Sequence, residues 1–243
     1  MKKLIGFGSL LILGLLLVWG YFYFNTSPSE NAMQAANETS KVDVLESDNT
    51  LIFEPKETTN KVSIILYPGA FVNALSYAPL AKNLAEHGYK TYIPEMPFDL
   101  AVFGKNKAEA IIDQNRDEEF VIGGHSLGGV MASRFANEHA DQLKGIFYLA
   151  SYPDKKGEIK GTNLAALSIT ATRDGVLNQT KYKENKRYLP NDTTFTEIKG
   201  GNHAQFGSYG KQNGDRKATI SEEKQTSETS QAMISWLEKI KLK

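Results

Sequence analysis

The pattern of hydrophobic and polar positions divides the chain into three stretches. Residues 4–24 form an apolar and aromatic run that contains Ser9 as its one polar residue and has no charged side chain. Residues 25–49 are rich in Ser, Asn, Glu, Thr and Ala and have little apolar periodicity, which predicts a flexible linker. In residues 50–243, short apolar runs alternate with segments of helical periodicity, which predicts one folded domain.

The alternation in the third stretch predicts an α/β fold, a mostly parallel sheet with helices on both faces. The expected strands are 61–67, 90–93, 120–123, 145–150, 167–171 and 194–198, and the expected helices are 77–87, 108–114, 129–139, 180–188 and 227–240. In such a sheet, ligands bind beyond the carboxyl ends of the strands. Polar residues that directly follow strands are therefore the first candidates for chemistry.

The apolar run at residues 4–24 reaches the roughly 20 residues that a helix needs to cross a bilayer. It follows two lysines and ends in four consecutive aromatic residues, which are typical of a membrane interface. We therefore expect one transmembrane helix at residues 1–24, an uncleaved signal-anchor that crosses the cell membrane once and leaves the domain outside the cytoplasm. The alternative is a secreted protein, released by cleavage within the alanine-containing segment 32–36.

Composition excludes several classes of partner and site. Lys and Arg together number 28 and Asp and Glu also number 28, so a net charge of zero gives no reason to expect nucleic acid. The chain has no cysteine, which excludes disulfides, a thiolate nucleophile and a cysteine-ligated metal. We expect no metal and no cofactor, and we expect a monomer.

One glycine-rich segment has the setting of a catalytic nucleophile. Gly124, Ser126 and Gly128 form a G-x-S-x-G motif between a predicted strand and a predicted helix. A turn sharp enough to lift the serine above the sheet strains its backbone, and it needs glycine two positions away on each side. The segment lacks the Gly-Lys-Ser/Thr ending of a phosphate-binding loop and the G-x-G-x-x-G spacing of a dinucleotide site. We therefore predict Ser126 as the nucleophile.

The general base is predicted by elimination among four histidines. His87 and His139 end predicted helices, and His125 lies too close to Ser126 along the backbone to reach its hydroxyl. His203 alone lies in a polar loop after a late strand, downstream of the serine. We therefore predict His203 as the base, the alternative being a histidine of a surface loop.

The acid that orients the base should follow a strand between the serine and the histidine. Asp174 fits, and the order Ser126, Asp174, His203 is the one that this architecture uses. Asp154, after the preceding strand, is the competing candidate, although its surroundings favour an exposed turn.

Two backbone N–H groups are candidates for stabilising an oxyanion. Leu127 follows the nucleophile at a helix start, where the helix dipole favours negative charge. The second donor should lie after the strand at residues 61–67, with Ala70 as first choice and Phe71 as second. Phe71, Phe103 and Tyr209 are also candidates for lining a substrate pocket, and packing in the core is the alternative for such side chains.

The serine motif, the loop Pro68-Gly69, Asp174 and His203 together resemble the α/β-hydrolase superfamily across residues 51–242. The closer resemblance is to small, cap-poor, dienelactone-hydrolase-like proteins, and three stretches carry it: YPGAFVNALSYAPLAKNLAEHGY, MPFDLAVFG and GGNHAQFGSYG. The resemblance implies an α/β-hydrolase fold and a hydrolase of esters or related acyl compounds. Dienelactone hydrolases use cysteine where this chain has serine, so that particular activity does not follow.

These residues predict an esterase-like serine hydrolase that cleaves a small acyl or ester substrate through an acyl-enzyme. The short gap between residues 150 and 167 has no room for the cap helices of larger lipases and predicts an open site. Two other functions stay open. They are an acyltransferase that uses the same triad and a non-catalytic binding module tethered to the cell envelope.

Overall fold

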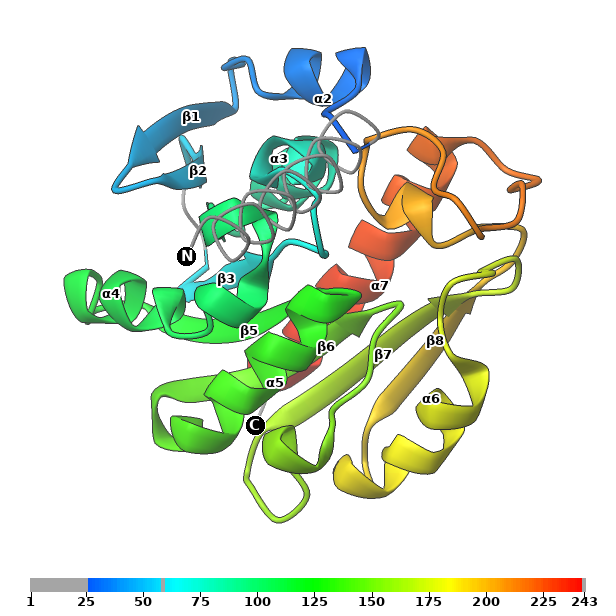
Figure 1. Cartoon of the computed structure of the whole chain (residues 1–243). Coiled ribbons are helices and arrows are strands. Elements are labelled where there is room, and N and C mark those ends of the chain that lie inside the picture. Colours follow the sequence, from blue (N-terminus) through cyan, green and yellow to red (C-terminus); the bar gives the residue numbers. More distant parts are fainter. Residues whose placement is uncertain (1–25, 58–59, 242–243) are drawn as a thin grey trace, which may run out of the picture.

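The computed structural model describes residues 26–57 and 60–241, and the expected transmembrane helix lies outside these residues. Within the described residues, no helix has the length and apolar character needed to cross a membrane. One eight-stranded sheet forms the centre of the molecule, with helices on both of its faces (Figure 1).

The sheet is mostly parallel, as the sequence predicts. Its strands are β1 (Val42–Ser47), β2 (Thr50–Pro55), β3 (Val62–Tyr67), β4 (Thr91–Pro94), β5 (Glu119–His125), β6 (Leu143–Leu149), β7 (Ala165–Ala171) and β8 (Thr194–Ile198). Their order across the sheet is β1-β2-β4-β3-β5-β6-β7-β8. β1 and β2 form an antiparallel hairpin, and β2 pairs antiparallel with β4. The remaining neighbouring strands all pair in parallel.

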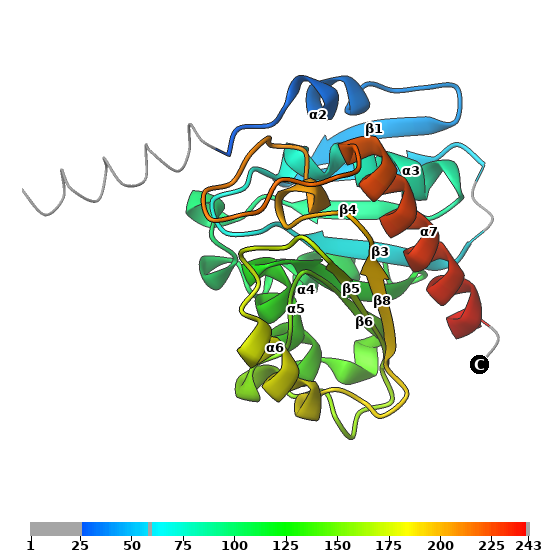
Figure 2. The same ribbon diagram turned by 90° about the vertical axis from the view of Figure 1, so that its right-hand side faces the viewer.

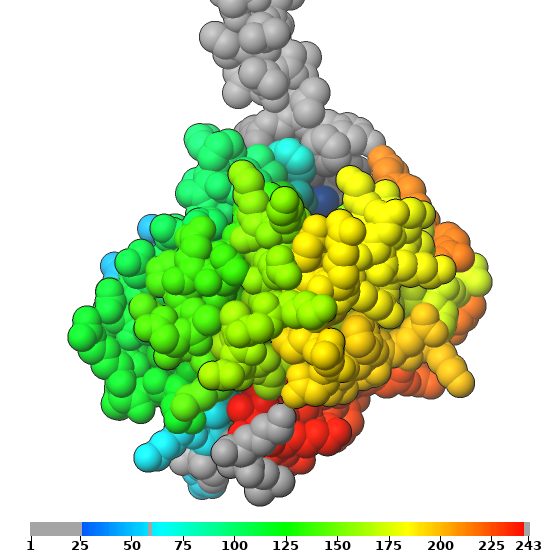
Figure 3. All heavy atoms as spheres, turned by 90° about the horizontal axis from the view of Figure 1, so that it is seen from below, coloured from blue at the N-terminus to red at the C-terminus, as the bar shows by residue number. Residues whose placement is uncertain are grey.

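Each face of the sheet has its own hydrophobic core. The helices are α2 (Glu30–Ala35), α3 (Ala78–Glu86), α4 (Lys107–Gln114), α5 (Leu127–Glu138), α6 (Gln179–Asn185) and α7 (Glu222–Lys241). Alternate residues of a strand point to opposite faces, so Ile64 of β3 packs with α3 and α7 while Ile65 packs with α4 and α5. Figure 2 shows α3 and α7 on one side of the sheet and α5 and α6 on the other. In the space-filling view from below, green segments around α5 and a yellow segment around α6 cover this second face (Figure 3).

The structure differs from the flexible linker expected at residues 25–49. Ser29 caps α2 by accepting a hydrogen bond from the N–H of Ala32 at 3.2 Å, and Ala32 is fully buried. Val42 of β1 is fully buried as well. The folded domain therefore begins well before residue 50. Its start has no recognisable pattern in the sequence because these two short elements bury few apolar side chains.

Candidate active site

Ser126 lies in the sharp turn between β5 and α5. Its backbone has φ 50° and ψ −121°, a conformation that residues with a side chain rarely adopt. The turn brings its glycines against the chain after β3: a Cβ on Gly128 would lie 2.2 Å from the carbonyl oxygen of Tyr67, and a Cβ on Gly124 would lie 2.5 Å from the same atom. Both glycines are therefore required, and this is the strained turn that the motif predicts.

The turn leaves the serine accessible at the start of a helix. Ser126 and Leu127 are partly exposed, whereas His125 and Gly128 on either side are buried. Leu127 is the first residue of α5, where backbone N–H groups lack an acceptor within the helix. The positive end of the helix dipole adds to this preference for negative charge. Leu127 is thus placed where an oxyanion donor is needed.

Ala70 and Phe71, the two candidates for the second oxyanion donor, differ in the hydrogen bonding of their backbone. The N–H of Phe71 donates to the carbonyl oxygen of Asp99 at 2.7 Å, so Phe71, our second choice, is wrong as an oxyanion donor. Phe71 also has φ 60°, a strained value that belongs to this tight loop. Ala70 is partly exposed and remains the candidate in the loop after β3.

His203 and Asp174 form a buried hydrogen-bonded pair. The imidazole Nδ1 of His203 lies 2.8 Å from Oδ2 of Asp174, and both side chains are almost fully buried. An ionised carboxylate can only accept hydrogen bonds, so Nδ1 carries the proton. The other carboxylate oxygen of Asp174 accepts the N–H groups of Val176 and Leu177, each at 2.8 Å. Asp174 is thereby fixed in place and holds the ring of His203 in one orientation.

The pair lies next to the serine turn. His125 directly precedes Ser126, and its ring centroid is 4.5 Å from that of His203. Nε2 of His203 is buried and has no hydrogen-bond partner among the described residues, so a bond from Ser126 to His203 is absent in this structure. Such catalytic hydrogen bonds are often long without substrate and tighten when it binds.

Asp154, the competing acid, has a different partner. Both carboxylate oxygens of Asp154 bind the guanidinium of Arg134, and Oδ1 also accepts the N–H groups of Lys156 and Gly157 at 3.1 and 3.0 Å. Burial acts to raise the pKa of Asp154, but the hydrogen bonds and positive charge of Arg134, together with the N–H groups of Gly157 and Lys156, bring the pKa below the ordinary value. The contacts of Asp154 are those of a structural ion pair.

A comparison of two isosteric variants tests which acid is used. Asp174→Asn should lower kcat for p-nitrophenyl acetate by about 10⁴-fold, because an amide no longer holds His203 in the tautomer that leaves Nε2 free. Asp154→Asn is the matched control, which breaks the ion pair with Arg134 and should leave kcat nearly unchanged. A large loss of kcat in Asp154→Asn, with Asp174→Asn still active, would reverse the assignment.

Two polar side chains that the sequence analysis did not select hold the acid and base loops. Asp215 accepts the N–H groups of Gly175 at 2.8 Å and of Ala204 at 2.9 Å, so one carboxylate joins both loops. Gln225, buried on α7, accepts the N–H of Asn202 at 2.9 Å and donates to its carbonyl oxygen at 2.8 Å. No motif marks either residue, because each contact forms only when distant loops fold together.

His125 is linked to the loop after β3. The hydroxyl of Tyr77 accepts the N–H of Gly69 at 2.8 Å and forms a second hydrogen bond with Nδ1 of His125 at 2.9 Å. Burial lowers the pKa of His125 well below its ordinary value, and the neighbouring His203 lowers the pKa further. His125 is therefore a neutral side chain that connects the serine turn with the candidate oxyanion loop.

The neutral state of His125 predicts a loss of stability in acid. Below pH 6.5 the unfolded chain takes up a proton at this residue and the folded chain does not. The free energy of unfolding should therefore decrease as the pH is lowered through 6.5, with a slope from this group that approaches about 1 kcal/mol per pH unit well below that pH. His125→Gln should reduce the slope in urea unfolding measured between pH 7.5 and pH 5, whereas His87→Gln, at an exposed helix end, should keep it. Equal slopes for His125→Gln and the unaltered protein would contradict the interpretation.

The three candidate pocket residues lie in different environments. Tyr209 is buried, with its ring centroid 6.4 Å from that of His125 and its hydroxyl donating to Gln212 at 2.9 Å. Phe71 is half-buried in the loop after β3. Phe103 is on the surface. Tyr209 thus packs beside the serine turn, and Phe103 is not a core residue.

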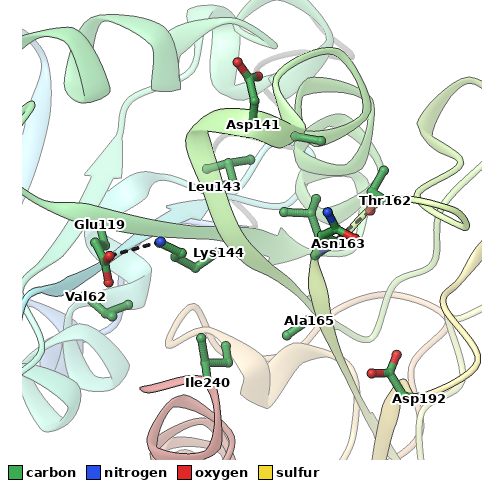
Figure 4. A pocket seen from close by; sticks show the side chains of 12 residues that line it. Val62, Glu119, Asp141, Leu143, Lys144, Thr162, Asn163, Ala165, Asp192 and Ile240 are labelled. Carbon is green, nitrogen blue, oxygen red and sulfur yellow. Dashed lines mark hydrogen bonds and ion pairs between the residues drawn. The ribbon is translucent and has the colours of Figure 1, made fainter. Parts of the chain in front are cut away.

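A cavity of about 700 Å³ lies at the opposite edge of the sheet (Figure 4). Val62, Glu119, Leu143 and Ala165, the first residues of their strands, line it. Glu119 is ion-paired with Lys144 at 3.0 Å. None of the candidate catalytic residues lines this cavity, which is at the amino ends of the strands, away from the edge where chemistry is expected.

Comparison with solved structures shows the same fold in several hydrolases. A thermophilic esterase from Thermogutta terrifontis is 11% identical, with a TM-score of 0.58 over 84% of this chain and 99% of that chain. MGS-MChE2, an alpha/beta hydrolase enzyme from a sediment metagenome of the Mar Chica lagoon in Morocco, is 15% identical, with a TM-score of 0.59 over 81% and 98%. An alpha-beta serine hydrolase homologue from Coxiella burnetii is 16% identical, with a TM-score of 0.52 over 69% and 90%.

No curated protein matches the chain. Residues 63–227, which run from β3 into α7 and include Ser126, Asp174 and His203, match the Alpha/beta hydrolase family. The expected resemblance is confirmed: this chain belongs to the alpha/beta hydrolase family.

Proposed function

We propose that this protein is a serine hydrolase that cleaves carboxylic esters or related acyl compounds through an acyl-enzyme. One observation carries the proposal. A strained and partly exposed serine lies at the carboxyl end of β5, and the buried pair of His203 and Asp174 packs against the same turn. A serine, a histidine with one free nitrogen and an anchored carboxylate are the groups that nucleophilic acyl transfer requires.

In the first half of the reaction, Nε2 of His203 takes the proton of Ser126 while the serine oxygen attacks the carbonyl carbon of the ester. The N–H groups of Ala70 and Leu127 stabilise the negative charge on the carbonyl oxygen. His203 then gives its proton to the leaving alcohol as the ester bond breaks. The product of this half is an acyl group bound to Ser126.

In the second half, water attacks the acyl carbon and gives a proton to Nε2 of His203. The protonated His203 returns that proton to the oxygen of Ser126 when the acyl bond breaks, which releases the acid. Asp174 stabilises the imidazolium in both halves without leaving its hydrogen bond to Nδ1.

Only one 3₁₀ turn, Lys155–Gly157, lies between β6 and β7, which favours an open site and a small substrate.

We also propose that residues 1–24 anchor the protein in the membrane as a single-pass helix, with the domain outside the cytoplasm. The contacts of α2 support the uncleaved form. Cleavage within residues 32–36 would cut α2, remove the buried Ala32 and break the bond from the N–H of Ser29 to Ser208 at 2.8 Å. It would also separate Asn31 from Glu222, which it binds at 2.9 Å.

A fluorophosphonate probe and a panel of esters test the function. The full chain in detergent should become covalently labelled and should hydrolyse p-nitrophenyl esters, and mass spectrometry should find the label on the peptide that contains Ser126. Absence of both labelling and turnover would favour a binding module. Formation of a new ester when an alcohol is added, faster than release of the free acid, would favour an acyltransferase.

A further inference from the structure

Three large apolar side chains are exposed together after β4. Phe98, Val102 and Phe103 are 69%, 47% and 64% exposed, and we call these three residues the apolar patch. The rings of Phe98 and Phe103 contact each other edge to face, with centroids 5.9 Å apart. Phe98 and Asp99 both have positive φ, so this loop keeps a strained backbone while its aromatic side chains stay in solvent. Clustered exposed apolar groups mark a contact surface.

Asp99, a neighbour of the apolar patch in the chain, is hydrogen-bonded to the candidate oxyanion loop. The carbonyl oxygen of Asp99, next to Phe98, accepts the N–H of Phe71 at 2.7 Å. Phe71 directly follows Ala70, the proposed second oxyanion donor. The patch therefore lies at the edge of the sheet where the partly exposed Ser126 is placed.

The N-terminal segment reaches the domain at the same place. The hydroxyl of Thr26 donates to the carbonyl oxygen of Phe71, and Thr26 is buried. One residue, Asn25, separates Thr26 from the end of the apolar run at Phe24. Two residues of extended chain span at most about 7 Å. If residues 4–24 cross a bilayer, the loop of Phe71 must therefore lie close to the membrane surface.

We propose that the apolar patch inserts into the outer surface of the lipid bilayer, so that Ser126 acts on acyl esters whose chains lie in that membrane. The occupant of the patch is lipid because only Asn25 lies between the uncharged run and Thr26, which is hydrogen-bonded to the loop that adjoins the patch, so no length of linker could carry the domain away from the bilayer. The part that concerns substrate rests on the proposed hydrolase function, and the part that concerns orientation does not.

The orientation is tested with single labels, which the chain allows because it has no cysteine. The full chain carrying Phe103→Cys, labelled with an environment-sensitive fluorophore, is reconstituted in vesicles of phosphatidylcholine and phosphatidylglycerol in equal amounts. Its fluorescence should be quenched by lipids that carry a nitroxide on the acyl chain. Phe195→Cys on β8 is the matched control, an aromatic residue with 46% exposure at the far edge of the sheet, and it should not be quenched. Equal quenching at both positions, or none at residue 103, would overturn the proposal.

The substrate class is tested by replacing both phenylalanines of the patch. Phe98→Ser with Phe103→Ser should lower kcat/KM for a long-chain ester held in vesicles by about tenfold for each phenylalanine removed from the lipid. The same variant should keep the urea unfolding midpoint of the unaltered chain, which shows that it folds, and it should lose less than about tenfold in kcat/KM for water-soluble p-nitrophenyl acetate. An equal loss on both esters would contradict a role in lipid contact. If neither ester is hydrolysed by the unaltered chain, the proposed function fails, and the quenching experiment still decides the orientation.

Discussion

Ser126→Ala should lower kcat for an activated ester by about 10⁴- to 10⁶-fold and abolish labelling by a fluorophosphonate probe. The hydroxyl of Ser126 is the group that forms the covalent bond, and no other side chain can replace it in that turn. The variant should fold, because alanine has the same Cβ as serine and experiences the same strain at φ 50°. Steady-state rates on p-nitrophenyl acetate and gel detection of the label measure the two effects.

Ser230→Ala is a matched control for the loss of a hydroxyl. Ser230 is a buried serine of α7 that donates to the carbonyl oxygen of Ser227 at 3.0 Å, within its own helix. Its removal should leave both the rate and the labelling unchanged. Turnover by Ser126→Ala at more than a small fraction of the original rate would show that another nucleophile acts, and the proposed mechanism would be wrong.

The parallel part of the sheet could be predicted because its strands have a local pattern. β3 is buried on both faces, so Ile64, Ile65, Leu66 and Tyr67 follow one another directly, with Ile64 and Ile65 in different cores. The hairpin of β1 and β2 could not be predicted in this way. β1 lies at the edge of the sheet, and most of its side chains are at least partly exposed, which makes its sequence similar to that of a linker.

The same distinction explains which parts of the site could be predicted. The turn at Ser126 is specified locally, since its strain requires Gly124 and Gly128 at fixed spacing. Asp174 and His203 could be selected because each follows a strand, and the contact between them is present. Asp215 and Gln225 act through contacts between segments far apart in the chain, which no spacing reveals.

Replacement of His203 by glutamine should reduce kcat about as strongly as loss of the serine, by about 10⁴- to 10⁶-fold. Glutamine is chosen because its amide can still donate a hydrogen bond to the buried carboxylate of Asp174, so that charge keeps a partner. The amide cannot take the proton of Ser126. His139→Gln, at the end of α5, is the control and should keep its activity, as measured on the same ester.

The double variant Ser126→Ala with His203→Gln tests whether the two residues act as one unit. A base has no function once the hydroxyl that it activates is gone, so the double variant should be no slower than Ser126→Ala alone. If the fold-decreases in kcat of the two single variants multiply in the double variant, His203 stabilises the transition state independently of Ser126. If His203→Gln stays active and His125→Gln does not, the base is His125, whose ring packs against that of His203.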